Sequence, residues 1–281
     1  MIKGWIIYPR PVTETQRNNN AFGLMADAAE KNGIELKILF KEDIILICGT
    51  KPGILYKKEE VEKPLFAFIR CYDQHLSEHL ETMGIRVFNN SESMFISQDK
   101  FLTHLKLCEA GIPTPLTFAG IDDYHTACCL LKSERFIMKS PYGSKGEYVF
   151  LVDNETDFNK YKGMLVQEYI EYSRGRDIRV WVTGNNVTAA VLRYNENSYL
   201  SNYSQGGSFK RIDIDEIAAD LALKSAACTG LEISGIDILF KNENEYTVCE
   251  VNGNAGFRTL YAAYPEVDMP MEIFGYISSV L

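Results

Sequence analysis

Three oxygen-bearing side chains near the end of the chain have the types and spacing of a site for a hard metal ion. Asp237 is the lone carboxylate of the apolar run Ile236–Phe240, and Glu250 and Asn252 lie two residues apart in Tyr246–Asn252. Residues two apart in a strand share a face, so these groups converge if the two strands are neighbours. Such oxygens suit Mg²⁺, which often takes nucleotide phosphates as further ligands. The alternative, strand-edge acids facing water, ranks lower because both acids interrupt apolar runs, where an unpaired charge is costly.

A hairpin with lysines, Phe136–Leu151, is the second candidate. Lys139 closes an apolar strand, and Gly143, Ser144 and Lys145 follow in a short loop. Such a loop lets backbone N–H groups approach an anion closely, and the two lysines add positive charge. This pattern fits a flap over nucleotide phosphates. Taken alone, a surface β-turn with solvated lysines is the better interpretation, and the spacing of a Walker A loop is absent.

A polar strand end in the middle of the chain is the third candidate. Gln167, Glu168, Tyr169 and Ile170 end a predicted strand whose edge could hydrogen-bond a purine. Asp177, shortly after, is placed to hold a ribose hydroxyl or a neighbouring cation. As a bare pattern this signal is weak, because an ordinary strand–turn–strand accounts for it equally well.

Two arginines and a few scattered groups complete the candidates. Arg179 and Arg193 lie on successive predicted strands, and arginine suits bidentate contact with phosphate or carboxylate. Isolated arginines are usually surface salt-bridge partners, and only the other motifs raise the rank of these two. His75 and His79 are spaced for a metal on a helix but lack a third ligand, and a packed thiol is the favoured interpretation of Cys71.

The elements around these residues alternate in type. The first ninety residues alternate strands with helices, which predicts an open, mostly parallel sheet. A helix predicted over Ser97–Ala110 opens a second region, where Phe136–Ser140 and Tyr148–Val152 form a hairpin in a small α+β unit. The third region is predicted as strands followed by the helix Asp215–Thr229 and two final strands. The strands predicted in the first region are Trp5–Tyr8, Ile34–Phe40, Leu65–Ile69 and Ile85–Phe88, with a further apolar run at Ile44–Cys48, and its helices are Asn20–Lys31 and Gln74–Met83.

Composition limits the class of protein. The 281 residues are 46% hydrophobic and 24% charged, which favours a folded chain of two or three compact units. The net charge of −9 argues against a nucleic-acid partner, because a phosphate backbone requires surplus Lys and Arg. No signal peptide or membrane-spanning run is predicted. The seven scattered cysteines indicate reduced thiols in a cytoplasmic protein.

Taken in order, these segments resemble the ATP-grasp superfamily and, within it, the RimK-like carboxylate–amine ligases. The resemblance runs from about Ile69 to Ile277 and rests on the family order of individually weak motifs. These are Asn89–Ser91, Asp99–His104, Ala110–Pro115, the Lys139 hairpin, Gln167–Ile170, Gly175–Arg179, Gly206–Gly207, Gly235–Ile238 and Glu250–Asn252. The resemblance implies an α/β ATP-grasp fold with an α+β lid. It places a Rossmann-like pre-ATP-grasp domain over residues 1–90, an ATP-grasp domain over 91–281, a lid at about 104–165 and a metal and nucleotide subdomain at about 166–281.

The resemblance also implies roles for single residues. Arg179 and Arg193 would face the transferred phosphoryl group and the carboxylate substrate. Asp237, Glu250 and Asn252 would hold magnesium, as one or two ions, with manganese as a substitute. ATP would contact Lys100, Lys139, Ser144, Lys145, Gln167, Glu168, Tyr169, Ile170, Asp177 and Asn202.

Departures from the family pattern occur at positions that the resemblance implies face the substrate. The family often has Arg-x-Asn where this chain has Leu200-Ser201-Asn202, and an arginine before the double glycine where Gln205 stands. The usual Asn-x-x-Pro-Gly ending has Ala255 in place of proline, and Arg258 could replace a missing cation. The nucleotide elements are therefore kept while substrate-facing positions have changed.

The predicted function is an ATP- and magnesium-dependent ligase that joins a carboxylate to the amine of an amino acid, peptide or protein terminus through an acyl phosphate. Arg10, Asn20 and Arg70 are expected to help form the substrate pocket. The alternatives are a kinase on the same fold and a nucleotide-binding regulatory protein without turnover. The oligomeric state is left open, a homo-oligomer among the alternatives.

Overall fold

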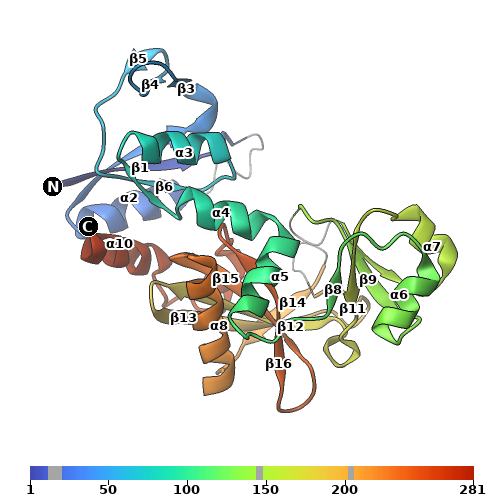
Figure 1. The fold of residues 1–281 in the computed structure, drawn as a ribbon. Coiled ribbons are helices and arrows are strands. Elements are labelled where there is room, and N and C mark those ends of the chain that lie inside the picture. The colour runs from blue at the N-terminus through green and yellow to red at the C-terminus, as the bar shows by residue number, and fades with distance from the viewer. Residues whose placement is uncertain (12–20, 144–147, 202–205) are drawn as a thin grey trace. The chain divides into compact units, whose positions relative to one another are not determined.

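The computed structural model describes residues 1–11, 21–143, 148–201 and 206–281 (Figure 1). The chain forms two compact units. The first contains Met1–Phe95 together with the short segment Gly230–Ile233 and the C-terminal segment Asp268–Leu281. The second contains Ile96–Thr229 and Ser234–Val267. The chain therefore passes between the units more than once, whereas the sequence prediction places a single boundary near residue 90.

A parallel sheet forms the centre of the first unit. Its strand order is β2-β1-β6-β7, and each neighbouring pair runs parallel, as the strand–helix alternation predicted. The buried side chains Ile6, Ile7, Phe66 and Phe68 show why these strands are nearly continuous apolar runs, since both faces are covered. The elements are β1 (Ile2–Tyr8), α2 (Ala21–Lys31), β2 (Ile34–Phe40), β6 (Phe66–Ile69), α3 (Gln74–Thr82), β7 (Arg86–Phe88), α4 (Ser91–Gln98, whose last residues enter the second unit) and α10 (Met269–Val280).

A small antiparallel sheet follows η1 (Lys41–Asp43) in the same unit. It is formed by β3 (Ile44–Ile47), β4 (Gly53–Tyr56) and β5 (Glu59–Glu60). The sequence indicated only an apolar run at Ile44–Cys48 here, and none of the three was predicted as a strand. In the turn after Tyr56, Lys57 and Lys58 both have positive φ, a conformation that usually requires glycine. Because neither residue is glycine, the sequence carried no signal of this turn.

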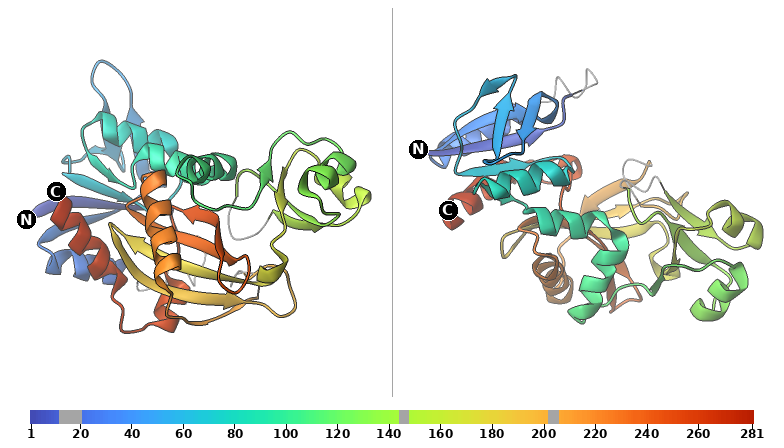
Figure 2. Two further views of the ribbon diagram at one scale, coloured as in Figure 1. Left: turned by 60° about the horizontal axis from the view of Figure 1, so that its bottom comes forward. Right: turned by 45° about the horizontal axis from the view of Figure 1, so that its top comes forward.

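Two sheets build the second unit. The first has the order β10-β9-β11-β8, and β9 pairs antiparallel with both β10 and β11, which confirms the predicted hairpin. The second has the order β14-β13-β12-β15-β16, and α8 packs across it (Figure 2). The elements are α5 (Lys100–Glu109), β8 (Thr117–Phe118), α6 (Tyr124–Leu131), β9 (Phe136–Lys139), β10 (Val149–Val152), α7 (Glu155–Lys160), β11 (Leu165–Glu168), η2 (Glu171–Ser173), β12 (Arg176–Thr183), β13 (Asn186–Tyr194), β14 (Ser208–Arg211), α8 (Glu216–Thr229), β15 (Ile233–Phe240), β16 (Tyr246–Asn252) and α9 (Arg258–Ala263).

The single helix predicted over Ser97–Ala110 is wrong, because α4 ends at Gln98 and a new helix begins at Lys100. Asp99 separates the two helices. Its backbone is extended, and its carboxylate accepts hydrogen bonds from the N–H groups of Phe101 and Leu102. Asp99 is therefore the N-cap of α5 rather than an interior residue, and it fixes where that helix starts. None of the helices in the described ranges is both long and apolar enough to cross a membrane.

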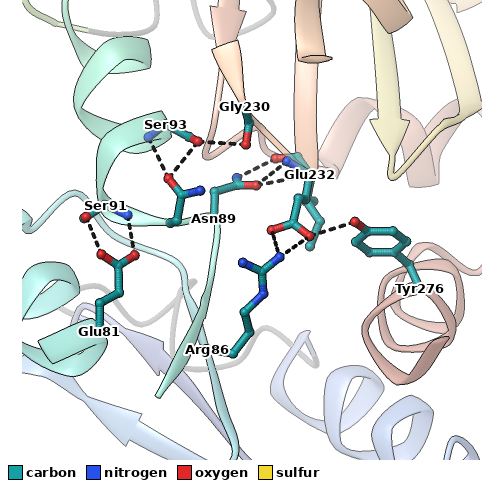
Figure 3. A network of polar contacts seen from close by, with 10 residues as sticks. Glu81, Arg86, Asn89, Ser91, Ser93, Gly230, Glu232 and Tyr276 are labelled. Carbon is teal, nitrogen blue, oxygen red and sulfur yellow. Dashed lines mark hydrogen bonds and ion pairs between the residues drawn. The ribbon is translucent and has the colours of Figure 1, made fainter. Parts of the chain in front are cut away.

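The side chain of Asn89 ties the short segment between α8 and β15 into the first unit (Figure 3). Its Oδ1 accepts from the N–H groups of Glu232 (2.8 Å) and Ile233 (2.9 Å), and its Nδ2 donates to the carbonyl of Ile233 (2.7 Å). Nearby, the carboxylate of Glu232 pairs with Arg86 at 2.8 Å and accepts from the Tyr276 hydroxyl at 2.7 Å. Asn89 is almost fully buried, so one carboxamide satisfies three backbone groups that water cannot reach.

Replacing Asn89 is expected to destabilise the protein strongly. Asn89→Ala leaves two buried donors and one buried acceptor without their partner, which we expect to cost roughly 2–4 kcal/mol. Asn89→Asp keeps the acceptor and should lose less. Urea unfolding measures the difference, with Asn244→Ala in an exposed turn as the control that stays within about 0.5 kcal/mol of the wild type. Equal stability of Asn89→Ala and the control would contradict the assignment.

Candidate active site

A cleft in the second unit contains about 930 Å³ of empty space, part of it continuous with solvent. Arg179 and Asn252 do not line the cleft, although each lies on a strand that contributes to it, and Ser144, Lys145 and Asn202 are outside the described residues. The predicted residues that line the cleft are Lys100, Lys139, Gln167, Glu168, Tyr169, Ile170, Asp177, Arg193, Asp237 and Glu250.

The three predicted metal ligands lie on one pair of neighbouring strands. β15 and β16 are antiparallel, with Asp237 opposite Glu250 and Gly235 opposite Asn252. Residues directly opposite share a face, and residues two apart on a strand do so too, so the three oxygen-bearing groups share one face. Among the residues that the structure describes, no group of three His, Cys, Asp or Glu gathers as a metal site. The predicted set is not such a group, since it has two acids and an amide, and its metal role stays a prediction.

Asp237 is held by two arginines. Arg179 donates to both carboxylate oxygens, with Nη2 at 2.7 Å from Oδ2, and the Nη2 of Arg193 lies 3.0 Å from the same Oδ2. Burial would raise the pKa of Asp237, but the two guanidinium groups outweigh it and hold that pKa below its ordinary value. The two arginines therefore offset the cost of placing this acid in an apolar strand.

Asp177 pairs with Arg193 from the adjacent strand. The two residues are opposite each other across β12 and β13, and the pair is bidentate, with Nε–Oδ1 at 2.7 Å and Nη2–Oδ2 at 2.5 Å. Burial would lower the pKa of Arg193, but the carboxylates of Asp177 and Asp237 reverse this and raise it. With the half-buried Arg179, these buried residues form a set of two positive and two negative charges. The roles predicted for them, ribose contact for Asp177 and phosphoryl contact for the arginines, stay predictions.

Two lysines supply positive charge at another wall of the cleft. Lys139 ends β9 and is 3% exposed, and burial lowers the pKa of its ammonium group. Lys100, the first residue of α5, donates to the carbonyl of Gly143 at 2.6 Å, and its Nζ lies 3.6 Å from Glu250. Lys100 and Lys139 therefore lie beside the pair of acids, Asp237 and Glu250. A phosphate chain that contacts the lysines would fit there.

The strand that was predicted to meet a purine forms the next wall. Glu168 pairs with Leu116 twice: its N–H donates to the Leu116 carbonyl at 2.8 Å, and its carboxylate accepts from the Leu116 N–H at 3.1 Å. Gly175 precedes β12 and has a φ of +65°. A Cβ added to Gly175 would come within 2.3 Å of the Asn195 carbonyl oxygen. Only glycine fits the turn that leads into β12.

Three residues at the cleft were not singled out by the sequence analysis: two line it, and one lies behind its wall. Arg176 lies between the rings of Tyr172 and Phe240 and lines the cleft, and Cys249 lines it between Val248 and Glu250. His104 lies behind the cleft wall, where it contacts Lys139 and Gln167. Its position one helical turn after Lys100 is a signal that could have found it, because residues four apart share a helix face.

The side chains present fit a magnesium–nucleotide ligand. The cleft has apolar walls such as Ile137 and Leu239, cations at one end and the paired acids of β15 and β16 beside them. Polyphosphate requires such cations, and magnesium prefers oxygen ligands. This combination can bind a nucleotide and concentrate positive charge on its phosphates.

Comparison with known proteins places this geometry in a family. The family model described as the RimK-like ATP-grasp domain matches residues 97–277. A Legionella pneumophila protein named "Probable alpha-L-glutamate ligase" is 32% identical over 268 residues, which are 89% of this chain and 88% of the relative. "Beta-citrylglutamate synthase B" of Danio rerio is 27% identical over 275 residues, which are 90% of this chain and 68% of that protein.

A solved structure agrees in fold. The ATP-grasp ligase PsnB, complexed with a phosphomimetic variant of its minimal precursor, Mg and ADP, has a TM-score of 0.72 at 17% identity, and 99% of this chain and 98% of that chain are covered. The predicted ATP-grasp fold and ligase class are therefore confirmed. This chain belongs to the RimK-like ATP-grasp family of ATP-dependent ligases.

Proposed function

We propose that this protein joins a carboxylate to an amine through an acyl phosphate, with ATP and magnesium bound in the cleft of the second unit. The observation that carries the proposal is the pairing of Asp237 with Glu250 across β15 and β16, within reach of Lys100. A magnesium site next to a phosphate-binding lysine is what phosphoryl transfer from ATP needs. Asn252 on the same strand face completes the oxygen set.

The chemistry has two steps. A carboxylate oxygen of the substrate attacks the terminal phosphorus of ATP, and ADP leaves. The amine nitrogen then attacks the acyl carbon and forms the C–N bond, the C–O bond to the phosphate breaks so that phosphate leaves with the bridging oxygen, and the nitrogen gives up a proton. Magnesium, when bound, withdraws charge from the phosphates. Lys139 and Lys100 offset the remaining negative charge, and the enclosed wall limits hydrolysis of the acyl phosphate.

Arg193 serves the first step in this proposal. It is buried, it lines the cleft, and two carboxylates fix its guanidinium. A cation that is already oriented stabilises developing charge without reorganisation. Arg179 does not line the cleft, so we assign it the support of Asp237 and Arg193 rather than substrate contact.

The substrate class follows from the relatives and from the departures in sequence. Both the Legionella and the zebrafish names contain glutamate, which offers an amine and carboxylates. We therefore propose an amino acid of this kind, or a peptide ending in it, as one substrate. The sequence has Leu200 and Gln205 where the family often has arginine, which supports a second substrate with less negative charge. A cytoplasmic location stays a prediction, as do a homo-oligomer and the absence of a nucleic-acid partner.

A kinase and a regulatory protein are the alternatives that the sequence left open, and membership of the ligase family argues against both. A kinase would release a phosphorylated product, and a regulatory protein would bind ATP without turnover. The paired acids favour turnover, because magnesium ligands have little use in a site that transfers no phosphoryl group.

Trapping with hydroxylamine is expected to detect the acyl phosphate. Protein, ATP, magnesium and pools of amino acids and short peptides, glutamate among them, should yield ADP and hydroxamate. Glu250→Gln should lower the rate at least about a hundredfold, because a metal ligand is lost. Glu243→Gln, in the exposed turn between β15 and β16, is the matched control with an unchanged rate. A phosphorylated product without hydroxamate would favour the kinase, and a normal rate in Glu250→Gln would refute the metal assignment.

Removing the metal is expected to stop the reaction reversibly. EDTA should abolish ADP formation, and added Mg²⁺ should restore it, because lysines alone do not neutralise the phosphates. Mn²⁺ should restore it as well, since oxygen ligands also suit that ion. ADP formation measured with each ion is the test. Full turnover in EDTA would contradict a metal-dependent mechanism.

A further inference from the structure

His104 is a buried histidine that belongs to none of the roles assigned above. It lies on α5, one turn after Lys100, and is 3% exposed. Its Nε2 lies 3.1 Å from the Nζ of Lys139 and 2.9 Å from the Nε2 of Gln167. Its Nδ1 makes a short hydrogen bond with the hydroxyl of Thr114. One imidazole thus connects the lysine at one wall of the cleft to the strand β11 at the next.

The partners of His104 determine where its proton lies. A lysine ammonium group only donates, so the Nε2 that faces Lys139 must be an acceptor and carry no hydrogen. The neutral ring then has its hydrogen on Nδ1, which donates to Thr114. The Thr114 hydroxyl in turn donates to the carbonyl of Val248 at 3.0 Å. Each donor in this chain therefore has an acceptor.

The same logic fixes the side chain of Gln167. Because Nε2 of His104 accepts, Gln167 must present its NH₂ group to the ring rather than its oxygen. The second hydrogen of that NH₂ group goes to the Thr117 hydroxyl at 2.7 Å, and Thr117 donates to the carbonyl of Pro115 at 2.8 Å. A reversed tautomer would place an N–H against Lys139 and break the network.

The surroundings keep the ring uncharged. Burial, followed by the positive charges of Lys139 and Lys100, lowers the pKa of His104 to about 2. A charged ring would repel Lys139 and lose its acceptor. The imidazole therefore acts as a fixed neutral acceptor, and it occupies one of the three N–H donors of Lys139.

We propose that His104 is a positioning residue of the nucleotide site, whose Nε2 aims the ammonium group of Lys139 at the phosphates and holds the Gln167 amide of the base-binding strand. The proposal rests on the proposed function, in which Lys139 contacts ATP. His104 itself touches neither ATP nor substrate. It acts by restricting two side chains that would otherwise sample several rotamers.

A pair of variants separates positioning from packing. His104→Gln keeps an oxygen acceptor near the position of Nε2, whereas His104→Asn reaches only the position of Nδ1. Titration calorimetry with Mg·ATP should show a dissociation constant about tenfold higher for His104→Asn, as expected when a hydrogen bond to a charged group is lost. His104→Gln should stay within about threefold of the wild type. His125→Asn, on the exposed face of α6, is the matched control with wild-type affinity.

Steady-state kinetics and a reference variant make the outcome decisive. In His104→Asn the KM for ATP should rise while the KM for the carboxylate substrate stays unchanged. Lys139→Met should weaken ATP at least as much. If Lys139→Met binds ATP normally, the proposed role of Lys139 fails and this inference fails with it. If Lys139→Met is weak but the two His104 variants bind ATP equally, only the positioning role is overturned.

The wild-type protein offers a test that no misfolded variant can obscure. Nitrogen-15 spectra of the imidazole at pH 7 should show a protonated Nδ1 and an unprotonated Nε2 for His104. That pattern supports the positioning role. A protonated Nε2 would overturn it, because such a ring cannot accept from Lys139.

Discussion

Charge that is buried beneath the cleft must be balanced by opposite charge, and this requirement orders the centre of the second unit. Asp237 and Asp177 are both buried; the half-buried Arg179 donates to Asp237, and the buried Arg193 donates to Asp177. The residues come from β12, β13 and β15, which are neighbours in one sheet, so the register of these strands determines the pairing. A shift of one residue would turn each side chain to the opposite face and leave charges unpaired. The buried charges are therefore all paired only when the strands have the correct register.

A carboxylate in an apolar strand can be compensated by a bound metal ion or by an arginine, and the sequence is compatible with both. The lone position of Asp237 predicts a compensating cation, which the sequence analysis assigned to magnesium. In the structure Arg179 and Arg193 provide the compensation. Their contribution was not predictable, because it depends on which strands become neighbours. β15 follows β12 in the sheet although β13, β14 and α8 separate them in sequence.

Local patterns predicted the elements well where the apolar runs were long, as in β2, β15 and β16. They failed where one polar residue decides a boundary. Asp99 appears in sequence as the second polar residue of one helix, yet its carboxylate caps a new helix and so sets the direction of Lys100 and His104. The proton assignment of His104 was also beyond sequence, since its partners come from separate elements. Among those partners, Lys139 and Gln167 belong to motifs that the sequence shows, and Thr114 does not.

In the proposed function, magnesium and the two arginines would share Asp237. The carboxylate accepts three hydrogen bonds, two from Arg179 and one from Arg193. A carboxylate has about four lone-pair sites, so one magnesium bond can be added without losing every arginine contact. In the proposed function, magnesium would join an arginine-bound acid rather than a free one. Each arginine would then bind Asp237 less strongly, and the charge of Arg193 would become available to the phosphoryl group. Arg193, which lines the cleft and keeps Asp177 as a partner, is placed to respond without becoming an unpaired buried charge.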